Sequence, residues 1–127
     1  EPGAAALAAT RTLAADQRAW LIACADEVRN ATDDAGHRVA DSRLHLAIAT
    51  LAGSPLLVEA VTPAQAALAD LLAGIPVLQR NIAHSNDQHD AIVSAVLAGN
   101  PLTAREVMEE HCDATSALLR ALLPTRP

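Results

Sequence analysis

Apolar residues recur at spacings of three and four along almost the whole chain, and no stretch alternates strictly between apolar and polar positions. The first spacing places apolar side chains on one face of a helix, whereas strict alternation is typical of a half-buried strand. Breaks rich in Gly, Pro, Ser, Asn and Asp divide the pattern into six or seven segments. Helices are therefore expected over residues 2–9, 12 to about 30, 38–51, 55 to about 73, 85 to about 98, and 102 or 103 to 123.

Residues that favour helix ends mark several of these boundaries. The expected N-caps are Thr12, Ser54 and Ser85, the last forming a capping box with Gln88. Pro63 lies inside the fourth segment, so that helix either continues with a kink or restarts at Thr62. Residues 124–127, with the sequence PTRP, are expected to close the last helix.

The composition favours a single all-α domain. The chain has 127 residues, of which 51% are hydrophobic, with one Trp and neither Phe nor Tyr. Ala and Leu dominate and runs of β-branched residues are missing, which favours packed helices over sheets. The length suits one compact domain. The expected fold is therefore a single antiparallel bundle of six to seven helices, formed by residues 1–127.

Charge and hydropathy argue against several classes of partner. The formal net charge is −6 and the chain has no Lys, so it offers no basic surface for phosphates and should bind nucleic acid poorly by itself. No apolar run reaches about 18–20 residues, so no transmembrane helix is expected, and no secretory leader is visible. The two cysteines, Cys24 and Cys112, form no disulfide pattern, which favours a reduced, cytoplasmic chain.

Three of the expected helices place a histidine on the face that should be buried. Asp41 and His45 stand one turn apart on one face of the helix over 38–51, while His89 and His111 share stripes with aliphatic residues of the last two helices. Burying an imidazole without a partner is costly, and burying a lone carboxylate is costlier. A shared divalent cation such as zinc or nickel would stabilise all four groups, because imidazoles and carboxylates are ligands for such ions.

Two other interpretations of these residues stay open. A buried histidine is more often hydrogen-bonded within a core than bound to metal, so the chain could be a metal-free helical module. A site of three His and one carboxylate could instead activate water in a metalloenzyme. His37 lies one turn before Asp41, where it is either a partner of a metal ligand or a residue of the helix start. His84 precedes the expected cap and should be solvated.

The order and spacing of these residues resemble a known family of regulators. Asp41 and His45 form a D-x3-H motif, followed by His89 and, 22 residues later, by His111. The segments "EPGAAALAA", "DSRLHLAIATLAGSPLL", "SNDQHDAIVSAVLAGN" and "AREVMEEHCDAT" are similar to that family's opening helix, metal motif and two C-terminal motifs. Over nearly its whole length, the chain resembles the effector-binding C-terminal (FCD) domain of FadR-type GntR-family transcription regulators.

The resemblance implies a helical bundle around a central metal and effector cavity, and a regulator domain rather than an enzyme. It assigns Asp41, His45, His89 and His111 as ligands of a divalent ion, zinc in the first place and nickel as the alternative. A small carboxylate or sugar acid would bind beside the ion. The resemblance also implies a cytoplasmic homodimer that binds DNA only through an N-terminal winged-helix domain, which residues 1–127 do not include.

Three residues are candidates for contact with the effector. Thr115 lies one turn after the last histidine on the same stripe, and Arg80 precedes the fifth helix, where it could pair with an acid group. His37 is the third candidate. The alternatives are a core hydroxyl for Thr115 and a surface charge for Arg80. The chain departs from the family pattern at Leu44, where Phe is usual, and at Gln88, where an acidic residue is common.

Overall fold

The computed structural model describes residues 1–123, and these residues form six α-helices and no strand. The helices are α1 (Pro2–Ala9), α2 (Ala15–Arg29), α3 (Asp34–Leu51), α4 (Pro55–Ala73), α5 (Gln79–Leu97) and α6 (Pro101–Leu122). The predicted all-α fold is therefore confirmed. Residues 124–127, which were expected to close the last helix, lie outside the described residues.

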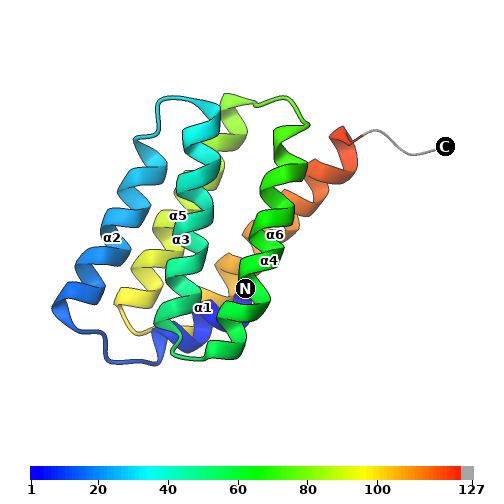
Figure 1. Cartoon of the computed structure of the whole chain (residues 1–127). Coiled ribbons are helices and arrows are strands. Elements are labelled where there is room, and N and C mark those ends of the chain that lie inside the picture. The colour runs from blue at the N-terminus through cyan, green and yellow to red at the C-terminus, as the bar shows by residue number, and fades with distance from the viewer. Residues whose placement is uncertain (124–127) are drawn as a thin grey trace.

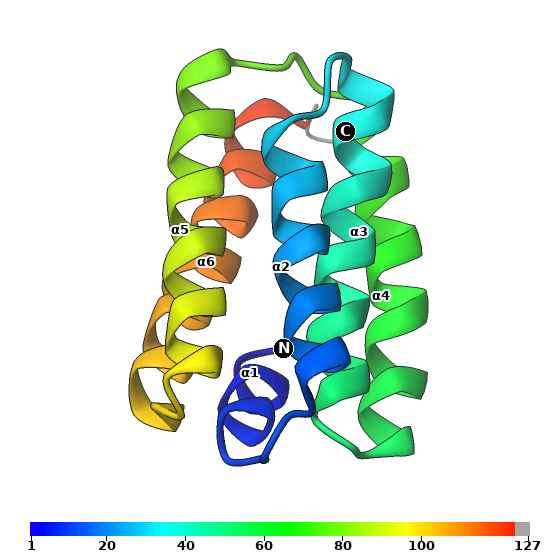
Figure 2. The ribbon, with the colours of Figure 1, turned by 90° about the vertical axis from the view of Figure 1, so that its left-hand side faces the viewer.

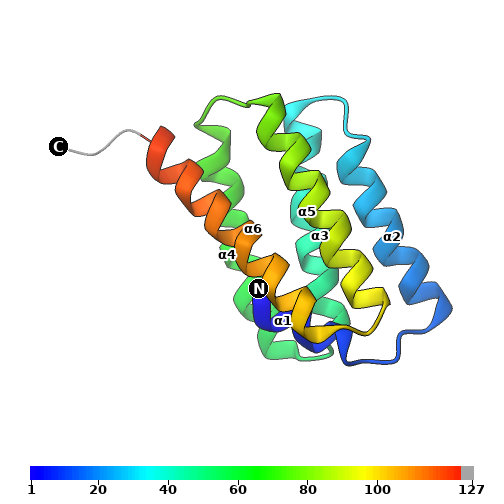
Figure 3. The same ribbon diagram turned by 180° about the vertical axis from the view of Figure 1, so that it is seen from behind.

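Five long helices form the bundle, and the short α1 closes one end of it (Figure 1). α3 packs between α2 and α4, while α5 packs against both α2 and α6. Figure 2 shows α1 lying across the foot of the bundle, where it contacts α3, α5 and α6. Seen from behind, α5 and α6 form the near layer, with α3 and α4 beyond them (Figure 3). The centre of the molecule is thus enclosed by helices distant in sequence.

The aliphatic stripes of these helices meet in a common core. Five of its large side chains are at most 2% exposed: Leu21, Leu44, Ile48, Ile92 and Met108. Burial of each stabilises the fold by about 1.5–3 kcal/mol. The helix α1 consists almost entirely of small residues, and its buried alanines allow close packing on α6 and α3. This packing brings Glu1, which precedes α1, to the centre of the bundle.

Thr12 does not cap α2, contrary to the expectation from the sequence. The helix begins at Ala15, and Gln17 closes its first turn, because Gln17 Oε1 accepts a hydrogen bond from the Ala14 amide at 2.8 Å. A glutamine that reaches back in this way satisfies one of the free amides of a helix start. The helix therefore begins without a hydroxyl cap.

The capping box expected at Ser85 and Gln88 is also wrong, because α5 begins at Gln79. No Gly or Pro interrupts residues 79–97, so the helix extends back almost to Pro76. Ser85 and Gln88 both lie inside α5. The Gln88 side chain is therefore available for a contact with a neighbouring helix.

The helix α4 is continuous through Pro63, so of the two alternatives the single helix is correct. It packs chiefly on α3, with Val61 and Gln65 buried.

Contrary to the expectation from the sequence, α4 is long and apolar enough to cross a membrane, and it alone among the helices of residues 1–123 is so. Only 11% of that apolar window is buried. Length and composition by themselves are weak evidence for a membrane span.

A side-chain cap explains why α3 begins at Asp34, four residues before the expected start: Asp33 Oδ1 accepts a hydrogen bond from the Gly36 amide at 2.6 Å. Asp33→Ala should lower the free energy of unfolding by about 0.5–2 kcal/mol, measured by urea denaturation. Ser54→Ala is the matched control, because Ser54 occupies the N-cap of α4 without a side-chain hydrogen bond. Equal losses in the two variants would contradict a capping role for Asp33.

Candidate metal centre

One carboxylate and three imidazoles converge in the middle of the bundle. Asp41 and His45 come from α3, His89 from α5 and His111 from α6. One possible ligand atom from each of the four residues lies within 4.8 Å of the others. The structure therefore brings together all four residues that the sequence singles out, although three separate helices contribute them.

The imidazole Nε2 atoms face the inside of this group. His111 Nε2 lies 3.2 Å from His45 Nε2 and 3.2 Å from His89 Nε2. Asp41 Oδ1 lies 3.1 Å from His89 Nε2 and 3.9 Å from His45 Nε2. The three imidazole residues are at most 5% exposed. Bulk water therefore does not solvate these nitrogens, and neighbouring groups must compensate them.

Side-chain acceptors hold the outer nitrogens of two rings. His45 Nδ1 donates to the Glu1 carboxylate, which also accepts a hydrogen bond from Gln65 Nε2 at 2.6 Å. His111 Nδ1 donates to Gln88 Oε1 at 2.9 Å. Because these acceptors fix a proton on Nδ1, the Nε2 lone pair of each neutral ring points to the centre.

This arrangement favours a positive charge at its centre. With neutral rings, the Nε2 lone pairs of His45 and His111 would face each other at 3.2 Å with no proton between them. A proton on His45 or a shared cation removes this repulsion. Burial lowers the pKa of His45, but the hydrogen bond with Glu1 and the charge of Asp41 outweigh burial and raise the pKa. Three ring nitrogens and one carboxylate oxygen are a donor set that fits zinc or a similar ion.

Electrostatics keeps the other groups in the protonation states that metal binding needs. Burial raises the pKa of Asp41, but the hydrogen bond from His89 and the nearby imidazole charges hold it well below its usual range. Burial, followed by repulsion from His45 and His89, lowers the pKa of His111 to about 3. Burial also opposes ionisation of Glu1, yet its contacts with His45 bring its pKa down to about 2. Near neutral pH, both carboxylates are therefore ionised and His111 is neutral.

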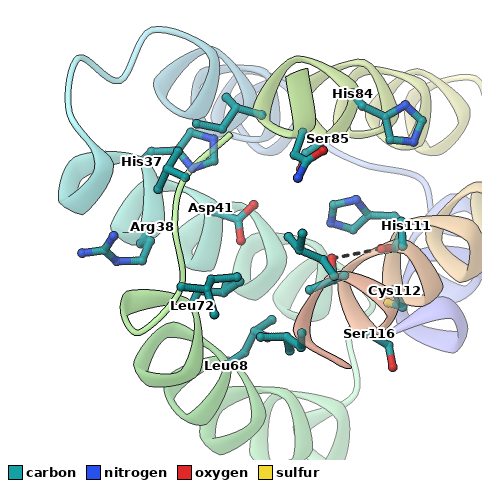
Figure 4. A pocket seen from close by; sticks show the side chains of 18 of the residues that line it. His37, Arg38, Asp41, Leu68, Leu72, His84, Ser85, His111, Cys112 and Ser116 are labelled. Carbon is teal, nitrogen blue, oxygen red and sulfur yellow. Dashed lines mark hydrogen bonds between the residues drawn. The ribbon is translucent and has the colours of Figure 1, made fainter. Parts of the chain in front are cut away.

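A cavity of about 500 Å³ opens directly onto this centre (Figure 4). Asp41, His45 and His111 line it, together with residues of α4, the α4–α5 connection and α6. His84 also lines the cavity and is exposed, as the sequence leads us to expect. The volume is in the range of sites that hold small organic ligands.

Two of the three residues expected to contact an effector line this cavity. Thr115 does so, with its hydroxyl donating to the His111 carbonyl at 3.1 Å. His37 does so as well, and its buried Nε2 has no hydrogen-bond partner among the described residues. Arg80 is exposed in the first turn of α5 and is not a lining residue, so the structure does not bring it to the cavity. Arg38 of α3 is the arginine that lines the cavity instead.

Several residues of the site were missed by reasoning from the sequence: Glu1, Arg38, Gln65 and Gln88. The sequence does carry a signal for Gln65, because it is a polar residue in a mostly apolar helix. In the structure its side chain is only 2% exposed. The sequence around Gln88 is typical of a capping box, so it gives no indication of the hydrogen bond between Gln88 and the His111 ring. Glu1 precedes the first helix, where periodicity gives no information about its neighbours.

The amino-acid sequence matches a known family along most of its length. The model of the FCD domain matches residues 1–114. The match spans α1 to α5 and the part of α6 that carries His111, so it includes all four residues of the centre. No curated protein matches the chain significantly.

The low pKa of His111 can be tested in metal-depleted protein. An unfolded histidine titrates near 6.5 whereas folded His111 titrates at about 3, so the unfolded chain binds more protons between these values. His111 therefore favours unfolding increasingly as the pH falls through this window. In an NMR titration, one imidazole should stay neutral down to about pH 4, and its signal should be absent in His111→Gln. The assignment is wrong if every imidazole is protonated by about pH 5.

Proposed function

We propose a sensing function for this chain, which belongs to the FCD domain family, the effector-binding C-terminal domain of GntR-family transcription regulators. In this proposal the domain binds one divalent metal ion through Asp41, His45, His89 and His111. A small carboxylate or sugar acid binds in the adjoining cavity. Zinc is the ion that we favour, with nickel as the alternative.

The observation that carries this proposal is the orientation of two buried rings. His45 and His111 have their Nδ1 atoms hydrogen-bonded to Glu1 and Gln88, and they turn their Nε2 atoms toward each other at 3.2 Å. In a metal-free core, each inward Nε2 lone pair of a neutral ring would need a donor of its own, and two such lone pairs would not face each other. When bound, the ion supplies coordination positions that a carboxylate oxygen of the effector can take.

The residues of the chain then have distinct tasks. The ionised Asp41 offsets the charge of the cation, and Glu1 and Gln88 orient the rings of His45 and His111. The cavity walls hold the effector away from bulk water. In the complete regulator, we propose a cytoplasmic homodimer whose winged-helix domain binds DNA. Effector binding would act on DNA affinity through its differential affinity for two domain arrangements.

Metal content is the direct test of the centre. Protein purified without chelator or affinity tag should hold about one zinc or nickel ion per chain by elemental mass spectrometry, and Asp41→Ala should lose most of it. Removing the ion should lower the melting temperature by roughly 10 °C at a hundredfold excess of ion over its Kd. Asp26→Ala is the matched control, because Asp26 is an exposed aspartate of α2 that neither belongs to the group of four nor lines the cavity.

The control variant should keep both the ion and the melting temperature. Metal-free wild-type protein whose melting curve is indifferent to added zinc and nickel would refute the metal centre. The buried histidines would then form a polar core, and the metal-free helical module would be the better interpretation.

Gln88 should act on the ion through the His111 ring. Gln88→Leu removes the acceptor of His111 Nδ1, so zinc affinity should fall about 10- to 100-fold in a competition titration. Gln88→Glu retains an acceptor and should keep the affinity near that of the wild type. Gln79→Leu, on the exposed first turn of α5, is the control for substitution on this helix. A loss of the same size in Gln88→Glu and Gln88→Leu would contradict this role.

A further inference from the structure

The cavity has a polar end at the centre and, beyond it, one mainly aliphatic wall. Asp41, His45 and His111 line the polar end. Beyond them, α4, the α4–α5 connection and α6 contribute mainly aliphatic side chains, whereas α3 and α5 contribute polar ones such as His37, Arg38 and Asn81. The aliphatic residues include Leu68, Leu72, Ile75, Val77, Leu118 and Leu119. These side chains come from the second half of α4, the α4–α5 connection and the last turns of α6. Figure 4 shows two of them, Leu68 and Leu72, beside the cavity on α4.

The apolar part extends well away from the centre along two helices. Leu72 follows Gln65 by seven residues on α4, and Leu118 follows His111 by seven residues on α6. At 1.5 Å per residue, each pair is separated by about 10 Å along the helix axis. A ligand held at the centre by one end would therefore have its other end between aliphatic walls.

The charged residues near the centre of the cavity favour a ligand with one acidic group. Arg38 is the single arginine among the lining residues, and it makes no ion pair within 4.0 Å with a described residue. In Figure 4 its guanidinium points away from Asp41 and His111. The other charged lining residues include Glu1, Asp34 and Asp41, which repel anions. Among the described residues, Arg38 is therefore the one arginine that a second carboxylate or a phosphate could meet in the cavity, and it points away from the centre that would hold the first acidic group.

Hydroxyl groups would also be poorly satisfied along the aliphatic wall of this space. The α3 and α5 walls offer polar side chains such as His37, Asn81 and Ser85, but the α4 wall beyond Gln65 and the α4–α5 connection offer aliphatic ones. On α6, the Thr115 hydroxyl already bonds the His111 carbonyl. A sugar acid would bury several hydroxyls against hydrocarbon, which costs free energy for each unpaired group.

We infer that the effector is a monocarboxylic acid with a hydrocarbon body, whose carboxylate lies at the Asp41, His45 and His111 end of the cavity and whose apolar body lies between α4, α6 and their neighbouring connection. This inference rests on the proposed function and narrows its effector class. It selects apolar acids over sugar acids, dicarboxylates and phosphates.

The test is a chain-length series on the zinc-loaded chain. Binding of acetate, butanoate, hexanoate, octanoate and decanoate is measured by calorimetry, with gluconate and adipate for comparison. Each added methylene should lower Kd about three- to fourfold until the cavity is filled. Gluconate and adipate should bind at least about tenfold more weakly than hexanoate, because of their buried hydroxyls and second charge.

A pair of neighbouring leucines provides the matched variants. Leu72 lines the cavity, whereas Leu71 is 45% exposed and does not. Leu72→Gln should flatten the dependence of Kd on chain length. Leu71→Gln should keep the wild-type dependence. Equal slopes in the two variants would place the hydrocarbon outside this cavity and overturn the inference.

The outcomes separate this inference from the proposed function. Zinc bound at one ion per chain with gluconate or adipate preferred, or with no effect of chain length, overturns the apolar-body inference alone. A steep chain-length dependence that survives chelation upholds the apolar body and refutes the role of the ion in acid binding. Absence of both zinc and acid binding refutes the proposed function, and the inference with it.

Discussion

Three imidazoles buried in an aliphatic core impose the constraint on which the rest of the structure depends. Each ring has two nitrogens, and a buried nitrogen without a partner costs free energy. The rings of His45 and His111 are hydrogen-bonded to Glu1 and Gln88. The buried Gln65 is in turn hydrogen-bonded to Glu1. The convergence of the inner nitrogens then calls for a central positive charge. The polar centre is therefore one interdependent network rather than a set of separate hydrogen bonds.

This network joins parts of the chain that lie far apart in sequence. The four central residues come from α3, α5 and α6, while Glu1 adds the start of α1 and Gln65 adds α4. Five of the six described helices thus meet in a single polar cluster, and α2 alone stays outside it. For a domain proposed to report on a ligand, this is a direct physical route from site occupancy to helix packing.

The all-α fold and the four central residues could be predicted from the sequence, because a packed helix needs apolar residues every three to four positions on its buried face. Asp41, His45, His89 and His111 were recognisable as polar residues at core positions. Their convergence needed only that the apolar stripes meet. This is why periodicity was sufficient both for the bundle and for the grouping of these side chains.

Other features depend on interactions that one sequence does not specify. The caps expected at Thr12 and Ser85 rest on local signals, and longer uninterrupted helical segments or a neighbouring glutamine override them. The choice between Arg38 and Arg80 depends on where each helix starts and how it is rotated. The contacts of Glu1 depend on how closely an alanine-rich helix can approach its neighbours.

The weak attachment of α4 has a kinetic consequence. This helix packs chiefly on α3, yet it supplies one aliphatic wall of the cavity and carries Gln65 into the polar network. Because α4 packs chiefly on one helix, it can move outward with the loss of the Gln65–Glu1 hydrogen bond, while Asp41 and the three histidines stay on their own helices. The rates at which a ligand enters and leaves would then both follow the motion of α4, while the strength of binding depends on the contacts made in the closed cavity. Substitutions at α3–α4 contacts outside the cavity are therefore expected to change residence time with little change in affinity.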